Sequence, residues 1–157
     1  MNLNYLNIYN NLVKLTRNKS LYIKLGRKDT FSERLIIFFF HLAFFLKIHK
    51  KTLSKKDSQK LFDYFIRQLE LSIREIGYGD VTINKKMKEY LNLFYSILEK
   101  IEIWNDKINE SKVDFISDYL NINKNIDFYV KYFDKYQLFL SKKSLKIFTK
   151  DVIDLKF

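Results

Sequence analysis

Few side chains in this sequence could carry chemistry. There is no cysteine, so disulfides, thiolate nucleophiles and thiolate metal sites are excluded. The two histidines, His41 and His49, are eight residues apart with no acidic residue between them, which fits neither the two-histidine zinc motif of a helix nor another zinc ligand set. His41 lies in a run of phenylalanines, where a histidine is more often a hydrogen-bonded core residue than a ligand. We expect no metal, no cofactor and no catalytic residue, and therefore a protein that is not an enzyme.

The carboxylates nearest to arginines lie in one segment of predicted helix. Glu70 and Glu75 are close in sequence to Arg67 and Arg74, and ion pairing along the helix is the ordinary account of such residues. The glycine pair that follows lacks the third glycine of a dinucleotide-binding loop, does not follow a strand and has no phosphate-loop lysine. We therefore expect no small-molecule substrate.

That glycine pair is the most informative feature of the chain, because it uses two of only three glycines in a sequence without proline. Gly77 is expected to be the left-handed residue that ends a helix, and Gly79 to let the backbone turn again before Asp80. One interpretation of the turn is purely structural: Arg74 and Glu75 close the preceding helix, and Asp80 accepts hydrogen bonds from the amides that follow.

The other interpretation of the turn is functional. The turn would form a polar edge beside an apolar groove for a partner helix, with Tyr78 as an anchor, because tyrosine is enriched at the energetic centres of interfaces. The spacing does not decide between the two interpretations. The candidate partner-binding residues are Arg74, Glu75, Gly77, Tyr78, Gly79, Asp80, Lys85 and Lys86.

The elements that position this turn are helical, because apolar residues recur at helical spacing and no sustained alternation indicates a strand. Helices are expected over residues 3–17, at 21–25 up to Gly26, over 31–50, from Ser54 to Gly77, from Lys85 onward, from Ser111, from Asn125, and after Ser144 before the tail 152–157. Thr30 and Glu33 are spaced as a capping box. The predicted fold is all-α: a single compact domain, residues 1–157, of about six to eight helices with a central helical hairpin.

The run from Leu35 to Leu46 is apolar on every side except at His41. Spanning a bilayer takes roughly 20 such residues, and charges at both ends limit this run to fewer. We expect a central helix of a helical bundle. A helix that lies in the membrane interface, or that forms a partner groove, is the alternative.

The chain is strongly basic, with 29 Lys and Arg against 18 Asp and Glu and a formal net charge of +11. Such a charge favours contact with RNA, ribosomes or anionic lipid. The lysines are spread along the chain, however, and lysine is favoured by AT-rich codon usage. A solvated charged surface without a partner explains the charge equally well.

Taken with its flanks, the turn resembles the signature of the ubiquinol-cytochrome c chaperone family, an Arg-Glu-x-Gly-x-Gly-Asp turn between two helices, followed by a basic pair. In this chain the turn is 74–80 and the pair is 85–86. The similarity extends over nearly the whole chain and includes Tyr22, Gly26, Asp29-Thr30, Arg34, His41, Leu61-Phe62-Asp63 and Phe94-Tyr95. The chain departs from the family at Ser96-Ile97, where Gly-Arg is favoured, and at Arg27-Lys28, where Val-Pro is common.

The resemblance implies a non-enzymatic chaperone that binds newly made cytochrome b and supports assembly of the ubiquinol-cytochrome c reductase complex. It also implies partners in a small co-chaperone and the ribosome, and the charge adds contact with an anionic membrane. No Arg-rich, acid-poor presequence opens the chain, which favours a bacterial protein on the cytoplasmic side of the inner membrane over one in the mitochondrial matrix. The alternatives are a basic helical module that binds RNA or ribosomes and a peripheral membrane-binding module.

Overall fold

A computed structural model of the protein describes residues 3–26 and 30–150. These residues form eight α-helices and one 3₁₀ helix, and they contain no strand, which confirms the all-helical prediction. The helices are α1 (Tyr5–Thr16), α2 (Lys19–Ile23), α3 (Phe31–His49), α4 (Lys55–Ile76), α5 (Asp80–Glu102), α6 (Asn109–Leu120), α7 (Ile126–Ser141) and α8 (Leu145–Thr149), with the 3₁₀ helix η1 (Trp104–Asp106) after α5.

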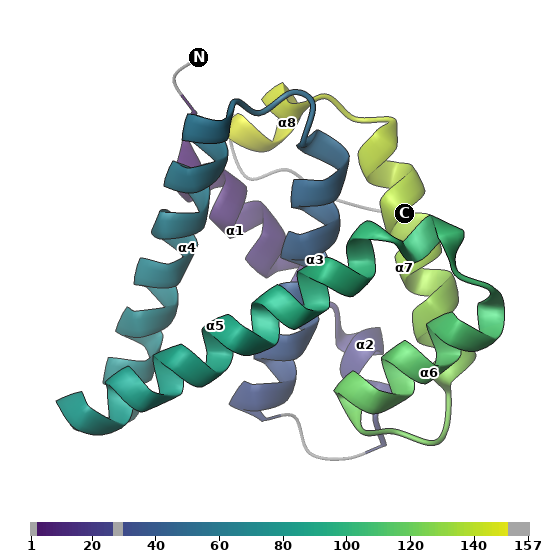
Figure 1. Cartoon of the computed structure of the whole chain (residues 1–157), viewed down its shortest axis with the longest axis horizontal. Coiled ribbons are helices and arrows are strands. Elements are labelled where there is room, and N and C mark those ends of the chain that lie inside the picture. Colours follow the sequence, from purple (N-terminus) through teal and green to yellow (C-terminus); the bar gives the residue numbers. More distant parts are fainter. Residues whose placement is uncertain (1–2, 27–29, 151–157) are drawn as a thin grey trace.

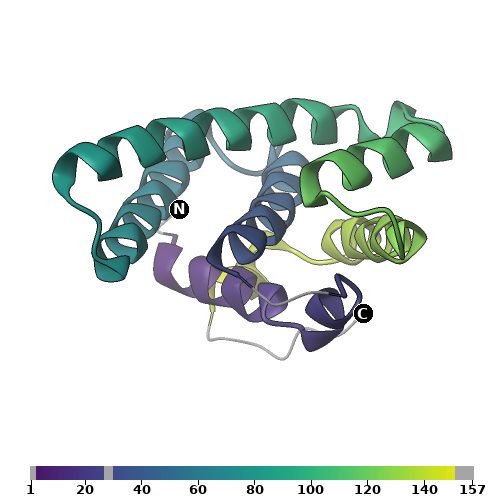
Figure 2. The same ribbon diagram turned by 90° about the horizontal axis from the view of Figure 1, so that it is seen from below.

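The central element is α3, around which the other long helices are arranged (Figure 1). Helix α5 crosses one side of α3 and α1 crosses the opposite side, as the view from below shows (Figure 2). Helices α6 and α7 contact α3 from a third direction. Residues 39–45 are buried without interruption, about two full turns, so every side of the helix is covered in this stretch.

The burial of α3 confirms the expected central helix and removes the basis for an interfacial one. An interfacial helix would need an exposed apolar side in the region 38–46, and this region packs inside the protein. Within the part of the chain that the structure describes, no helix combines the length and the apolar character that crossing a bilayer would require.

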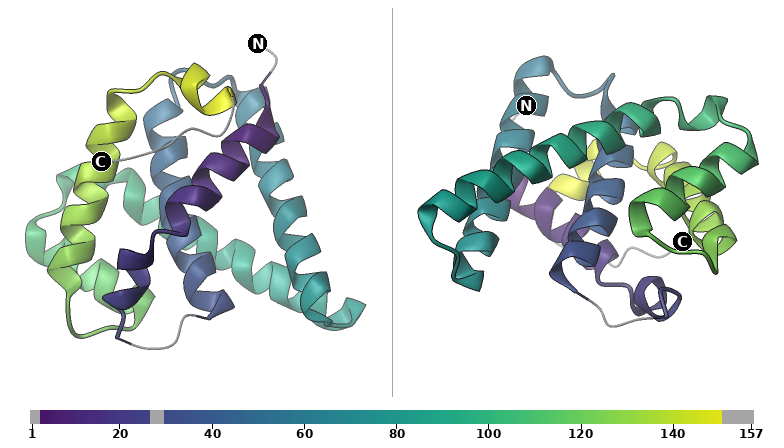
Figure 3. Two further views of the ribbon diagram at one scale, coloured as in Figure 1. Left: turned by 180° about the vertical axis from the view of Figure 1, so that it is seen from behind. Right: turned by 60° about the horizontal axis from the view of Figure 1, so that its bottom comes forward.

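Helices α4 and α5 form the expected hairpin, but its two arms diverge from the glycine turn like a V (Figure 3). Large aromatic side chains fill the space between the arms: the ring of Phe62 lies 5.7 Å from that of Phe94 and 5.8 Å from that of Tyr95. Helix α5 contacts α3 more extensively than it contacts α4. The hairpin is therefore held open by the core helix that it covers.

Local chemistry explains where α3 and α4 begin. The Glu33 amide donates to Thr30 Oγ1 at 3.3 Å and the Thr30 amide donates to the Glu33 carboxylate at 3.4 Å, which confirms the capping box. Ser54 caps α4 by accepting from the Asp57 amide at 3.0 Å.

Helix α2 spans Lys19–Ile23 rather than 21–25, and two further predicted helix starts were also displaced. Helix α5 begins at Asp80 rather than at Lys85, and α6 begins at Asn109 rather than at Ser111. Neither helix has a side-chain cap, so no capping residue marks its first turn in the sequence. The predicted features at Arg27-Lys28, Asp29 and the tail 152–157 lie outside the described residues.

His41 is a core histidine, as expected, and both of its ring nitrogens are used. Nδ1 lies 2.7 Å from the Ile37 carbonyl and Nε2 lies 2.6 Å from the Tyr132 hydroxyl. A carbonyl can only accept, so Nδ1 carries the proton and Nε2 accepts from Tyr132. Burial lowers the pKa of His41 to about 4, although the hydrogen bond to Ile37 acts in the opposite direction. The side chain is therefore a neutral link between α3 and α7.

His49 is also buried, but its Nε2 has no hydrogen-bond partner among the described residues. Its ring packs against Phe45 at 4.6 Å and Phe148 at 5.9 Å between ring centroids. Burial lowers the pKa of His49 to about 4. This ring fills space between α3 and α8 as an aromatic group.

The two buried histidines predict a stability that falls in mild acid. In the unfolded chain both rings have the ordinary pKa of 6.5 and bind protons below it, whereas the folded rings stay neutral down to about 4. Protons therefore favour the unfolded state in this window. Each histidine should lower the free energy of unfolding by about 2 kcal/mol between pH 7 and pH 5, which urea unfolding at the two pH values measures.

His49→Phe and His41→Phe separate the two contributions. His49→Phe keeps the ring contacts and removes an unpartnered nitrogen, so stability at pH 7 should not fall and the loss between pH 7 and pH 5 should halve. His41→Phe should cost about 1–3 kcal/mol already at pH 7, because it removes the Nε2 atom that accepts the hydrogen bond from the Tyr132 hydroxyl. An unchanged acid loss in His49→Phe would contradict this assignment.

Candidate functional site

The glycine turn joins α4 to α5 through three residues and lies at the outer end of the hairpin (Figure 1). Gly77 has φ 102°, in the left-handed region, and its amide donates to the Arg74 carbonyl at 3.0 Å. This confirms Gly77 as the residue that ends the helix.

The backbone turns again at Gly79 to begin α5 at Asp80, as expected, but it does so without a positive φ. Its φ of −74° and ψ of 161° are ordinary extended values, and a Cβ atom added there would meet nothing within 4 Å. Gly79 stands at the N-cap of α5, where it supplies no side-chain hydrogen bond. The local backbone therefore does not require glycine at this position.

Arg74 joins the two arms of the hairpin. Its Nη1 donates to Asp80 Oδ1 at 2.7 Å, and its Nε and Nη2 both donate to Glu70 Oε1, at 3.2 and 2.9 Å. These hydrogen bonds raise the pKa of Arg74 above its ordinary value, with the Asp80 bond as the larger cause. Asp80 thus pairs with Arg74 across the turn, which corrects the expectation that its carboxylate would accept from the amides that follow.

The tip of the turn carries apolar side chains in solvent beside lysines. Ile76 is 51% exposed, Tyr78 is 41% exposed and Val81 is 86% exposed. The ammonium group of Lys86 lies 4.8 Å from the centroid of the Tyr78 ring, and the preceding residue, Lys85, is exposed. We call Ile76, Tyr78 and Val81 the turn patch.

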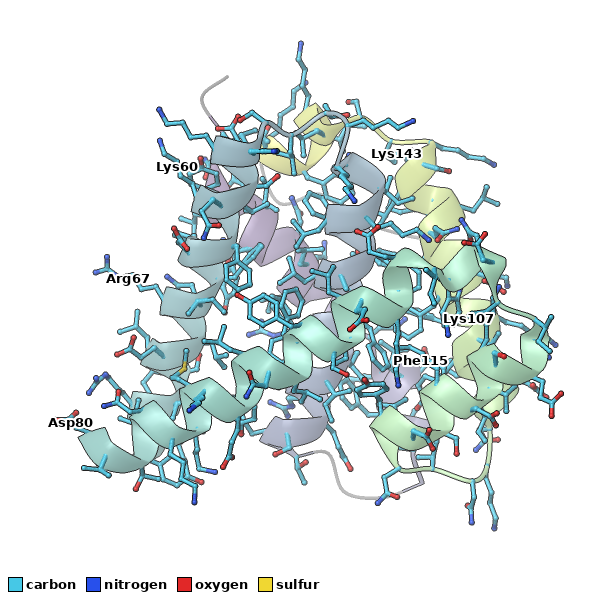
Figure 4. All side chains as sticks on the ribbon, viewed as in Figure 1. Lys60, Arg67, Asp80, Lys107, Phe115 and Lys143 are labelled. Carbon is cyan, nitrogen blue, oxygen red and sulfur yellow. The ribbon has the colours of Figure 1, made fainter. Side chains whose placement is uncertain are left out.

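The turn patch lies at the periphery of the protein. Asp80, the first residue of α5, is at the far end of the hairpin, and Arg67 extends outward from α4 (Figure 4). Glu75 is exposed in the last turn of α4. Burial is the largest cause that raises the pKa of Tyr9, and Glu75 is the smallest. The structure therefore brings Arg74 and Asp80 together and Tyr78 and Lys86 together, and it leaves Glu75 exposed to solvent.

A cleft on the α1 side of the molecule was missed in the sequence. It has a volume of about 730 Å³ and its walls come from α1, α2, α3 and α4, with one side chain from α5. Its lining includes Val13, Phe38, Leu42, Phe65, Leu69 and Phe94. The sequence marks these residues as apolar, but nothing in it shows that four helices leave a space between them.

No metal-binding arrangement is visible in residues 3–26 and 30–150, where no three His, Cys, Asp or Glu side chains are grouped to hold an ion. Two tyrosine hydroxyls of the core are used structurally. The Tyr136 hydroxyl donates to the His41 carbonyl at 3.0 Å, and the Tyr129 hydroxyl donates to the Leu21 carbonyl. Burial raises the pKa of Tyr136 well above its ordinary value, which keeps this hydroxyl a hydrogen-bond donor.

Substitution by alanine should affect the stability of the protein differently at the two glycines of the turn. Gly77→Ala should lower the free energy of unfolding by about 1 kcal/mol, because alanine is strained in the left-handed region. Gly79→Ala should change it by no more than about 0.5 kcal/mol. Urea unfolding of the two variants measures the difference, and Gly77→Asn should recover part of the loss because asparagine tolerates this conformation. Equal losses at both positions would contradict the assigned roles.

The region around the turn matches a known family. Residues 24–103, just over half of the chain, match the family model described as Ubiquinol-cytochrome C chaperone. This span contains α3, α4, the turn and α5, and hence all eight candidate residues; the wider similarity expected over nearly the whole chain is shown only for this part. The curated proteins and the solved structures give no match to the chain. The chain belongs to the ubiquinol-cytochrome c chaperone family.

Proposed function

We propose that this protein is a non-enzymatic chaperone that binds newly made cytochrome b and supports assembly of the ubiquinol-cytochrome c reductase complex, respiratory complex III. The observation that carries the proposal is the family match over residues 24–103, with the glycine turn well inside it. The description of the family names the ubiquinol-cytochrome c complex as the target. The resemblance implies that the client within this complex is cytochrome b, an apolar subunit. Binding such a client requires apolar protein surface that is accessible from solvent.

The turn patch is the surface that we assign to the client. Its apolar side chains Ile76, Tyr78 and Val81 are held at one point by the left-handed Gly77 and by the Arg74–Asp80 ion pair. Preorganisation of this kind reduces the entropy lost on binding. Lys85 and Lys86 add positive charge beside it, which suits a membrane segment whose neighbours are anionic lipids.

A general RNA-binding module is less well supported. Binding single-stranded RNA without sequence preference needs exposed aromatic rings on which bases stack. Among the described aromatic side chains, only those of Tyr78 and Tyr95 are exposed, and Lys86 lies over the ring of Tyr78. The aromatic residues therefore serve mainly the core.

The proposal includes a location and further partners. A bacterial protein would act at the cytoplasmic face of the inner membrane and a eukaryotic one at the matrix face, near the ribosome that delivers cytochrome b. A small co-chaperone belongs to the same proposal. The basic surface supports these contacts by its charge alone.

Val81→Asp tests the turn patch directly. Val81 is 86% exposed in the first turn of α5, where an acidic residue is favourable, so the fold should persist. Losing the burial of one valine side chain should reduce recovery of cytochrome b about tenfold. The measurement is a tagged pull-down in mild detergent, with cytochrome b quantified by immunoblot.

Ile108→Asp is the matched control. It makes the same change from an exposed apolar residue to an acid, also at the start of a helix, but on α6 and outside the matched span. Cytochrome b recovery with this variant should equal that of the native protein. The proposal fails if the native protein recovers no cytochrome b, and the assignment to the turn patch fails if the two variants behave alike.

A further inference from the structure

The cleft on the α1 side is lined mainly by apolar side chains. Its most buried lining residues include Phe39, Phe94 and Leu42, which are 3%, 1% and 2% exposed. Two polar side chains of the lining are used within the protein: the Tyr22 hydroxyl donates to the Thr16 carbonyl at 2.6 Å, and the Ser72 hydroxyl donates to the Gln68 carbonyl at 3.0 Å. Hydrocarbon is the chemistry that suits this interior.

The mouth of the cleft is cationic. Arg17, Lys19 and Arg34 are among the lining residues and are exposed, and none of the described lining residues is an aspartate or a glutamate. Ile23, which also lines the cleft, is 74% exposed. An occupant that matches both parts has an apolar body and an anionic end.

The size of the cleft suits a small molecule. Its volume of about 730 Å³ lies within the range of roughly 300–1,000 Å³ that is typical of small-molecule sites. An acyl chain is a single file of methylene groups, so it would lie within such a space with its headgroup at the mouth.

We propose that this cleft binds a single-chain anionic lipid, with the acyl chain between α1, α3 and α4 and the headgroup phosphate against Arg17, Lys19 and Arg34. Each methylene removed from water in the cleft stabilises the complex, and the cations fix the direction of the chain. The site lies apart from the turn patch, so the proposal goes beyond the chaperone function and does not depend on it.

The test compares two lipids that share one acyl chain and have headgroups of different charge. Titration calorimetry of the whole 157-residue chain measures both affinities, with lysophosphatidylglycerol and lysophosphatidylcholine of the same 14-carbon chain below their micellar concentrations. Lysophosphatidylglycerol is anionic and lysophosphatidylcholine is zwitterionic. We expect one lipid per protein and tighter binding of the anionic lipid.

A pair of double variants tests the mouth. Arg17→Gln with Lys19→Gln should weaken binding of the anionic lipid by about 3- to 20-fold and that of the zwitterionic lipid less than about twofold. Lys55→Gln with Lys56→Gln removes the same charge from exposed residues of α4 that do not line the cleft, and should leave both affinities unchanged. This control separates the cleft from the general attraction of a chain with a net charge of +11.

A second pair of variants tests the interior. Val13→Trp places a large side chain into the cleft and should weaken both lipids at least tenfold, whereas Leu6→Trp adds the same group at a 52% exposed position of α1 outside it. Circular dichroism and urea unfolding of all variants confirm that the fold is retained.

Three results would overturn the proposal. They are the absence of lysophosphatidylglycerol binding to the native protein, equal losses in the two charge variants, and equal losses in Val13→Trp and Leu6→Trp. Binding of an apolar helical peptide that Val13→Trp abolishes, without any lipid binding, would assign the cleft to a polypeptide instead.

Discussion

The structure depends on the need to cover a helix that is apolar on every side. Residues 39–45 of α3 are buried without a break, and a helix packed on one face would leave several of these side chains in water at a cost of about 1.5–3 kcal/mol each. Coverage therefore has to come from several directions at once. Helices α1 and α5 cross α3 on opposite sides, and α6 and α7 cover a third side of it. This coverage fixes the order of the layers. The hairpin of α4 and α5 is open for the same reason, because α5 lies across α3 instead of along α4.

A core built from aromatic rings also has to accommodate polar atoms, and tyrosines perform this role. Tyr132 and Tyr136 extend from α7 to the His41 ring nitrogen and the His41 carbonyl, so a single residue of α3 receives two hydroxyl groups. An unpartnered hydroxyl at this depth would cost about 1–3 kcal/mol, so the pairing selects one register of α7 against α3. Rings that make no hydrogen bond, such as Phe44 stacked on Phe133 at 5.5 Å, would tolerate a shift of α7 along α3 more easily. Trp104 adds a bond at the margin of the core, where its indole N–H donates to Asp134 at 2.8 Å.

Features that depend on residues close together in the sequence could be predicted, and features that depend on distant residues could not. The starts of α3 and α4 and the end of α4 depend on residues within one turn, such as Thr30 with Glu33, and these were predicted correctly. The start of α5 was placed five residues late, because its first turn has no side-chain cap and its Asp80 is held by Arg74 of the preceding helix. The cleft was not predictable, since it exists only through the relative placement of four helices, and helical periodicity shows which side chains are apolar but not which of them fail to meet.

Helix α4 connects the two surfaces to which we assign partners. One of its faces supplies Phe65 and Leu69 to the cleft, and its last turn supplies Arg74 to the glycine turn. Its position against α1 and α3 rests on aromatic edges, with Phe65 5.9 Å from the Phe38 ring and 5.8 Å from the Tyr9 ring, rather than on close backbone packing. Side chains that meet across a cleft give up dispersion contacts wherever the space between them is empty. An acyl chain in the cleft would restore some of these contacts and would hold α4, the helix that contributes to both surfaces, more firmly.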